Sequence, residues 1–168
     1  MNSNDVIRDA RVEHVRELKA EIARLKAGLS AATDELGEWR AHFDLALLAA
    51  ADAAKVPPGG RIVIVDGCNL LFNEFRRDKA ALLAAAGAVE AGFVWVVFDG
   101  PRENSRAEGR MRVSYTGGTG TQRADRLVTD YVRMLCRAGD THEVVVVTGD
   151  RDFRKAVEKE GAKCQDKF

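Results

Sequence analysis

Three short apolar stretches, each followed by an aspartate, constrain the fold of this chain more than any other feature. The first lies in residues 61–72, RIVIVDGCNLLF, where an apolar run rich in β-branched side chains meets Asp66. A run this short and uniformly apolar is typical of a central parallel strand that is covered on both faces. The residues after Asp66 read as a helix, so its carboxylate is expected at the turn between strand and helix. In open α/β sheets, ligands bind at that edge.

Two later stretches repeat this arrangement. The run FVWVVF at residues 93–98 is followed by Asp99, and the run VVVV at residues 144–147 leads into TGDRDF, which contains Asp150 and Asp152. Parallel strands end at the same edge of a sheet. The sequence therefore predicts that these carboxylates converge.

From residue 61 onward, strand-like and helix-like segments alternate, which indicates a three-layer α/β domain with a mostly parallel sheet. A strongly amphipathic helix is expected from Ala124, and Asp125 in its first turn would reach the same edge. The stretch TGGTGT at residues 116–121 lacks the Gly-Lys-Ser/Thr of a phosphate-binding P-loop, so we interpret it as a flexible loop. The other expected segments are helices at 69–75, 79–91 and 153–160, strands at 111–115 and 162–164, and a polar loop at 100–110.

Residues 1–54 contain no proline, and from Val15 their apolar residues recur at alternating spacings of three and four, which is typical of a coiled coil. Acidic residues at g positions precede basic residues at e positions, a pairing that favours parallel strands. We therefore expect a parallel homodimer through residues 15–50. A long amphipathic helix folded back on the globular domain is the alternative, because glycine and alanine weaken the seam. The a and d positions are Val15, Leu18, Ile22, Leu25, Leu29, Ala32, Leu36, Trp39, Phe43 and Ala46, and the charged g and e pairs are Glu21 with Lys26 and Glu35 with Arg40.

The stretch PPGG at residues 57–60 ends any helix and marks a boundary between domains. The expected organisation is a coiled-coil helix at 1–56, a linker at 57–60 and an α/β domain at 61–168. The chain has 26 basic and 26 acidic residues, so its overall charge favours no particular partner. No signal peptide or apolar segment long enough to span a membrane is visible, and we expect a cytoplasmic protein. Its cysteines, expected to be reduced and buried, are Cys68, Cys136 and Cys164.

The five aspartates suggest a metal site when they are considered together. Each alone can serve as a turn residue, a helix cap or a partner of a helix dipole. Carboxylates gathered at one edge repel one another unless a cation lies between them. Oxygen ligands without histidine or cysteine select Mg²⁺ or Mn²⁺, which can activate water for attack on phosphate. The candidates are Asp66, Asp99, Asp125, Asp150 and Asp152, with Asn69 as a neutral oxygen ligand.

Other site chemistries have little support in the sequence. His14 and His42 lie in the expected coiled coil, and His142 precedes a strand, which places it at the opposite edge. No histidine is therefore expected to act as a general base. The G-x-S-x-G pattern of a nucleophile elbow is also missing.

The motifs VDGCNLL, VVFDGP, T-x-x-AD (Thr121, Ala124, Asp125) and VVVTGDRDF resemble the NYN domain of the PIN-like nuclease superfamily, and most closely its YacP-like branch. The resemblance covers residues 61–164, and it differs in that the chain stops soon after Cys164. It implies a PIN-like α/β/α sandwich that cleaves RNA with Mg²⁺ or Mn²⁺. The implied catalytic and metal-binding residues are Asp66, Asp99, Asp125, Asp150 and Asp152, supported by Asn69 and Thr148.

Arginines around this edge suit recognition of RNA phosphates. We therefore expect a metal-dependent endoribonuclease, with a ribosome or another RNA–protein complex as a further partner. One alternative is a non-catalytic RNA-binding or adaptor module. Another is a Mg²⁺-dependent phosphatase or phosphotransfer domain, although the D-x-D pair of haloacid dehalogenases is replaced by Asp66-Gly67-Cys68. The arginines are Arg102, Arg106, Arg110, Arg112, Arg123, Arg126, Arg151 and Arg154.

Overall fold

The structure is a computed structural model that describes residues 3–117, 123–137 and 142–168, with side chains from residue 13 onward. The chain forms two compact units, residues 1–44 and residues 45–168. A single helix, α1 (Ser3–Ala53), makes up the first unit and continues into the second. The long N-terminal helix predicted from the sequence is therefore confirmed.

Within the first unit, the apolar a and d side chains of α1 are exposed in the single chain. Leu29 and Leu36 are each 70% exposed and Trp39 is 69% exposed. Charged side chains pair along the helix, as between Arg24 Nη2 and Glu21 Oε1 at 2.8 Å. An exposed apolar stripe with the heptad spacing agrees with the predicted coiled coil, whose pairing with another chain stays a prediction.

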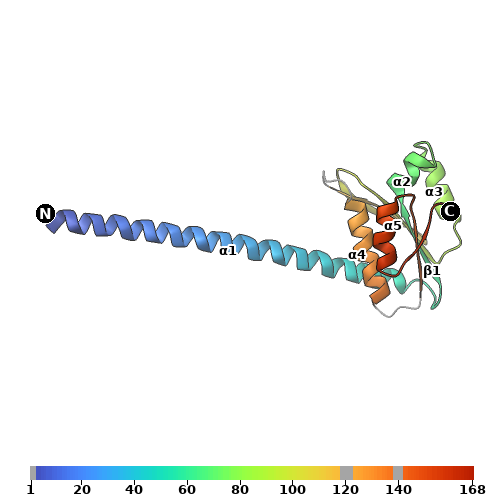
Figure 1. Cartoon of the computed structure of the whole chain (residues 1–168). Coiled ribbons are helices and arrows are strands. Elements are labelled where there is room, and N and C mark those ends of the chain that lie inside the picture. Colours follow the sequence, from blue (N-terminus) through green and yellow to red (C-terminus); the bar gives the residue numbers. More distant parts are fainter. Residues whose placement is uncertain (1–2, 118–122, 138–141) are drawn as a thin grey trace. The chain divides into compact units, whose positions relative to one another are not determined.

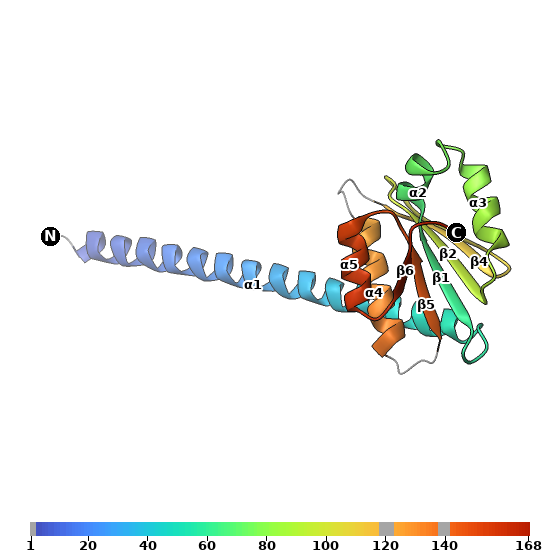
Figure 2. The same cartoon turned by 45° about the vertical axis from the view of Figure 1, so that its right-hand side comes forward.

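The second unit is built on a six-stranded sheet with the strand order β3-β4-β2-β1-β5-β6 (Figures 1 and 2). All neighbouring strands run parallel except β3, which is antiparallel to β4. The predicted α/β fold with a mostly parallel sheet is confirmed. The strands are β1 (Arg61–Asp66), β2 (Phe93–Phe98), β3 (Glu103–Glu108), β4 (Met111–Thr116), β5 (Glu143–Val147) and β6 (Lys163–Gln165).

Helices cover both faces of this sheet, with α4 and α5 on one side and α2 and α3 on the other (Figure 2). Successive residues of β1 point to opposite faces, so Ile62 and Ile64 pack with α4 and α5, whereas Val63 and Val65 pack with α2 and α3. Because both faces are buried, the strands read as continuous apolar runs rather than alternating ones. The helices are α2 (Gly67–Asn73), α3 (Lys79–Ala88), α4 (Arg123–Arg137) and α5 (Arg151–Lys159).

The last turns of α1 belong to the core of the second unit. Ala49 and Ala53 are buried with α4, and Asp52 is fully buried. Its Oδ2 accepts a hydrogen bond from the Tyr131 hydroxyl at 2.8 Å and forms an ion pair with Arg112 Nη1 at 2.6 Å. The division between the units therefore falls inside the helix, before residue 45, whereas the sequence pattern placed it at the prolines of residues 57–60.

Two segments differ from the expectations. Arg112 was expected at the surface near the acidic edge, but it is only 5% exposed and its guanidinium lies 4.5 Å from the Trp95 ring centroid, so this expectation was wrong. The polar loop expected at residues 100–110 contains the strand β3, all of whose side chains are exposed. A polar edge strand has no buried face, so it leaves no apolar alternation in the sequence.

The described part of the chain contains no helix that is both long and apolar enough to cross a membrane. The three cysteines are free and only partly buried, whereas the sequence pattern predicted buried thiols. His142 lies before β5, where its Nε2 is 3.0 Å from the Val56 carbonyl oxygen. His142 therefore lies at the edge of the sheet opposite to the edge that carries Asp66, as the sequence predicted.

Candidate active site

Asp66 ends β1 and caps α2. Its Oδ1 accepts a hydrogen bond from the Asn69 amide at 3.0 Å, and its Oδ2 accepts one from the Thr148 hydroxyl at 2.8 Å. The side chain is thus held from two sides, and the residue is only 7% exposed. The next residue has to be glycine, because a Cβ on Gly67 would lie 2.6 Å from the Phe98 ring and 2.7 Å from the Val97 carbonyl oxygen. Glycine therefore allows α2 to begin close against β2.

Asp99 follows β2 and connects this strand to α4. Its Oδ1 accepts hydrogen bonds from the Ala124 amide at 2.9 Å and from the Thr116 hydroxyl at 3.2 Å. Its own amide donates to Cys68 Sγ at 3.3 Å. The carboxylate thereby lies at the N-terminus of α4, where the helix dipole favours negative charge.

Asp150 and Asp125 come from the starts of two different helices. Asp150 caps α5, and its Oδ1 accepts hydrogen bonds from the amides of Asp152 at 2.8 Å and Phe153 at 3.0 Å. Asp125 lies in the first turn of α4. Each of the two carboxylates is therefore placed at a helix N-terminus, on the edge where β1, β2 and β5 end.

The electrostatics indicate that four of these carboxylates act on one another. Burial raises the pKa of Asp125 to about 6, and repulsion from Asp66, Asp150 and Asp99 adds to the rise. Burial also raises the pKa of Asp66, against two hydrogen bonds that lower it, and the charges of Asp150 and Asp99 raise it further. We call Asp66, Asp99, Asp125 and Asp150 the acidic cluster. Its members repel one another when all are ionised.

The fifth predicted aspartate lies differently. The Asp152 side chain is 94% exposed, and its Oδ1 is 3.3 Å from Lys155 Nζ. It does not contribute to the raised pKa values of Asp66 and Asp125. Proximity in sequence to Asp150 therefore does not bring its carboxylate to the acidic cluster.

The two supporting residues predicted from the sequence both contact the site. Thr148 is fully buried and donates its hydroxyl to Asp66. The Asn69 side-chain oxygen accepts a hydrogen bond from the Gly149 amide at 2.9 Å. A Cβ on Gly149 would lie 2.9 Å from that oxygen, so this glycine permits the contact. Both side chains position the ends of β1 and β5 against each other.

The donor set of the acidic cluster suits a hard divalent cation, because it consists of carboxylate oxygens. Among the described residues, however, no three histidine, cysteine, aspartate or glutamate side chains are grouped closely enough to hold an ion by themselves. Mg²⁺ usually keeps several waters and takes only one or two carboxylates together with substrate phosphates. The residues therefore fit an ion held partly through water, and they do not form a closed cage.

The predicted RNA-binding arginines have different surroundings. Arg110 donates to the carbonyls of Ala91 at 2.6 Å and Gly87 at 2.8 Å. These contacts place its guanidinium at the end of the sheet opposite to the acidic cluster. Arg154 is partly buried and pairs with Asp166. Residues 118–121 of the TGGTGT stretch, among them Thr121, lie outside the described residues. Arg110 is exposed all the same, as are the predicted arginines Arg102, Arg106, Arg123, Arg126 and Arg151.

A sequence profile of the YacP-like NYN domain matches residues 63–166, a span that contains the whole acidic cluster. The chain belongs to this family. No curated protein and no solved structure shows a significant match to the chain. NYN domains are in general predicted ribonucleases, so the family assigns a nuclease-like domain to this sheet and its helices.

Proposed function

We propose that this NYN domain is an endoribonuclease that hydrolyses RNA phosphodiester bonds at the acidic cluster with Mg²⁺ or Mn²⁺. The observation that carries the proposal is the placement of four carboxylates at the edge where β1, β2 and β5 end, with Asp66, Asp99 and Asp150 held by hydrogen bonds and Asp125 in the first turn of α4. Burial and the charges of the other three raise the pKa of Asp125 to about 6. A cation at this position would relieve the repulsion. The family supports the substrate class.

In this proposal Asp66, Asp99, Asp125 and Asp150 would hold the cation partly through water, and the bound ion would lower the pKa of a water and stabilise charge on the phosphate. The chain supplies orientation. Thr148 and the Asn69 amide fix both oxygens of Asp66, and the Ala124 amide fixes Asp99. These bonds hold the carboxylates in place before substrate arrives, which reduces the reorganisation needed at the site.

A non-catalytic RNA-binding or adaptor module is the second candidate. It is favoured by one observation, that the described carboxylates do not form a three-ligand metal site. A phosphatase of the haloacid dehalogenase type is disfavoured, because the second aspartate of its D-x-D pair is replaced by Cys68. The Cys68 sulfur accepts a hydrogen bond from the Asp99 amide. Exposed arginines near the edge suit phosphate contacts in either RNA-related function.

Cleavage of labelled single-stranded, structured and duplex RNA, in Mg²⁺, Mn²⁺ or EDTA, tests the proposal. Wild type should cut internally only with the cation, and Asp99→Asn should lose cleavage without a change in its circular dichroism spectrum. Asp152→Asn is the matched control, since its carboxylate is exposed, and it should retain cleavage. RNA binding without cleavage by wild type would instead support the adaptor.

We also propose that the chain is a homodimer through its N-terminal helix. The a and d side chains from Val15 to Ala46 are exposed along the helix and form an apolar seam. Acidic g residues and basic e residues meet as opposite charges only if the helices are parallel; antiparallel pairing would bring like charges together. Association with a ribosome or another RNA–protein complex stays a prediction.

A further inference from the structure

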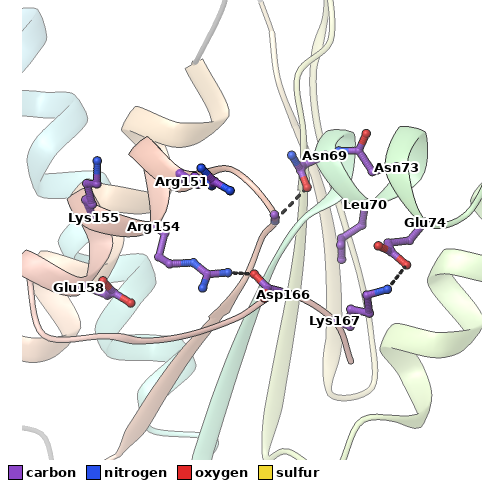
Figure 3. A pocket seen from close by; sticks show the side chains of 11 residues that line it. Asn69, Leu70, Asn73, Glu74, Arg151, Arg154, Lys155, Glu158, Asp166 and Lys167 are labelled. Carbon is purple, nitrogen blue, oxygen red and sulfur yellow. Dashed lines mark hydrogen bonds and ion pairs between the residues drawn. The ribbon is translucent and has the colours of Figure 1, made fainter.

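A cavity of about 710 Å³ lies beside the candidate active site. Figure 3 shows the side chains that line it. The cavity lies between α2, α5 and the segment after β6, and it shares Asn69 and Gly149 with the candidate active site. Its volume is in the range of small-molecule and nucleotide sites, about 300–1,000 Å³. The side chains that matter for the argument are Asn73, Arg151, Arg154, Lys155, Asp166 and Lys167.

Cationic groups converge on this cavity from two elements. Arg151, Arg154 and Lys155 come from α5, and Lys167 comes from the C-terminal segment, where its Nζ lies 3.1 Å from Glu74 Oε2. Glu158 and Asp166 also line the cavity, so the net positive charge is on the α5 side. Lys155 is 77% exposed at its side chain, so its ammonium is accessible to solvent. A strand of RNA approaching four carboxylates needs such cations beside them, because the acidic cluster alone repels phosphate.

Arg154 is the best-placed of these groups for a phosphate. Its Nη2 donates to the Thr148 carbonyl at 3.1 Å, which fixes the guanidinium beside the end of β5. Within the described residues its buried Nε has no hydrogen-bond partner. The anion that the guanidinium contacts is the Asp166 carboxylate (Figure 3). Asp166 is 67% exposed at its side chain, so this carboxylate can be displaced into solvent.

We propose that this cavity binds a backbone phosphate of single-stranded RNA next to the bond held at the acidic cluster, and that Asp166 occupies the place of this phosphate on Arg154 in the free chain. The proposal rests on the proposed function for the position of the cut. Guanidinium groups bind phosphate and carboxylate with the same fork of donors, so one can replace the other. Asn69 and Asn73 add amide groups to the wall of the cavity.

Fluorescence anisotropy of a short labelled oligouridylate in EDTA tests the subsite without cleavage. Lys155→Ala and Arg151→Ala should each weaken binding about three- to tenfold, as expected for the loss of one hydrogen bond at an exposed side chain. Each should also reduce the salt slope by about 1. Asp166→Asn should tighten binding, because it removes the competing charge. Loss in one variant and gain in another cannot both come from misfolding.

Lys159→Ala is the matched control, because Lys159 is an exposed lysine in the same helix but outside the cavity. Equal effects of Lys155→Ala and Lys159→Ala, or unchanged binding in Asp166→Asn, would overturn the subsite. Displacement of the oligonucleotide by uridine monophosphate at the oligonucleotide's own concentration would show a mononucleotide site and overturn the backbone assignment.

The failure of the subsite and the failure of the nuclease are distinguishable. If wild type cleaves RNA and all three cavity variants bind RNA as wild type does, the subsite alone is refuted. A chain that shows the predicted binding pattern but never cleaves retains the subsite and refutes the nuclease function.

Discussion

Replacing Asp125 by asparagine should raise the melting temperature of the cation-free chain at neutral pH. The pKa of Asp125 rises from 3.8 to about 6, first because of burial and then because of Asp66, Asp150 and Asp99. This difference of roughly two units corresponds to at most about 3 kcal/mol. Asp125 is partly exposed, so solvent screening reduces the effect to about 1.5 kcal/mol. Asparagine keeps the shape of the side chain and removes the charge.

A second effect acts in the opposite direction. Asp125 lies in the first turn of α4, so its neutralisation loses a favourable interaction with the helix dipole of about 0.5 kcal/mol. The net stabilisation is then about 1 kcal/mol, which corresponds to about 2–4 °C for a chain of this size. Asp152→Asn removes a first-turn charge of α5, together with its exposed ion pair to Lys155, without affecting the acidic cluster, so it serves as the control for the dipole effect. That control should melt slightly lower than wild type.

The pH dependence of this gap has a defined sign. A raised pKa in the folded state means that protonation of Asp125 favours folding, so its contribution is fully present below about pH 3.8 and is lost as the pH rises through about 6. The advantage of Asp125→Asn should therefore be complete above pH 6 and should disappear near pH 4. Thermal scans in EDTA at both pH values measure it. A variant that melts lower than wild type at neutral pH, or a gap independent of pH, would refute the electrostatic argument.

Three further predictions concern the architecture. Residues 45–168 should fold as a monomer that shows no self-association in light scattering. Residues 57–168 should melt at a lower temperature than residues 45–168, because the longer truncation removes Asp52 and its buried neighbours. Equal melting temperatures of the two truncated chains would contradict the placement of the last turns of α1 in the core. Arg112→Met should destabilise the fold by about 3–5 kcal/mol in urea unfolding, because it leaves Asp52 buried without its ion pair; a loss below 1 kcal/mol would mean that Lys55 and Tyr131 suffice. Gly67→Ala should cost about 1–3 kcal/mol, because the new methyl group meets the backbone of Val97, while Gly87→Ala, which meets nothing within 4 Å, should be neutral or stabilising.

The sequence was sufficient to predict the centre of the sheet and the acidic edge. The strand that ends at Asp66 is apolar on both faces, as a central parallel strand between two layers of helices has to be. The positions of Asp99 and Asp150 follow from the parallel strands that they succeed. Asp125 could be placed because the helix that carries it is amphipathic from its first turn.

Other features depend on contacts that no local pattern records. Asp152 shares its turn with Asp150, and only the three-dimensional course of α5 shows that its side chain points to solvent. Arg112 reads as one more surface arginine, because its partner Asp52 lies far earlier in the chain, in a segment that looks like coiled coil. Pairing between distant residues is invisible to periodicity. The same holds for the cavity, where α2, α5 and the C-terminal segment meet.

The amides that hold the carboxylates give each of three aspartates its own spectroscopic probe. Asn69 donates to Asp66, Ala124 donates to Asp99, and Phe153 donates to Asp150. Amide proton and nitrogen chemical shifts respond to the charge of the oxygen that they contact. In nuclear magnetic resonance spectra these three signals would move separately as each carboxylate gains a proton or a cation. Occupancy could thus be assigned to individual side chains in solution without any substrate.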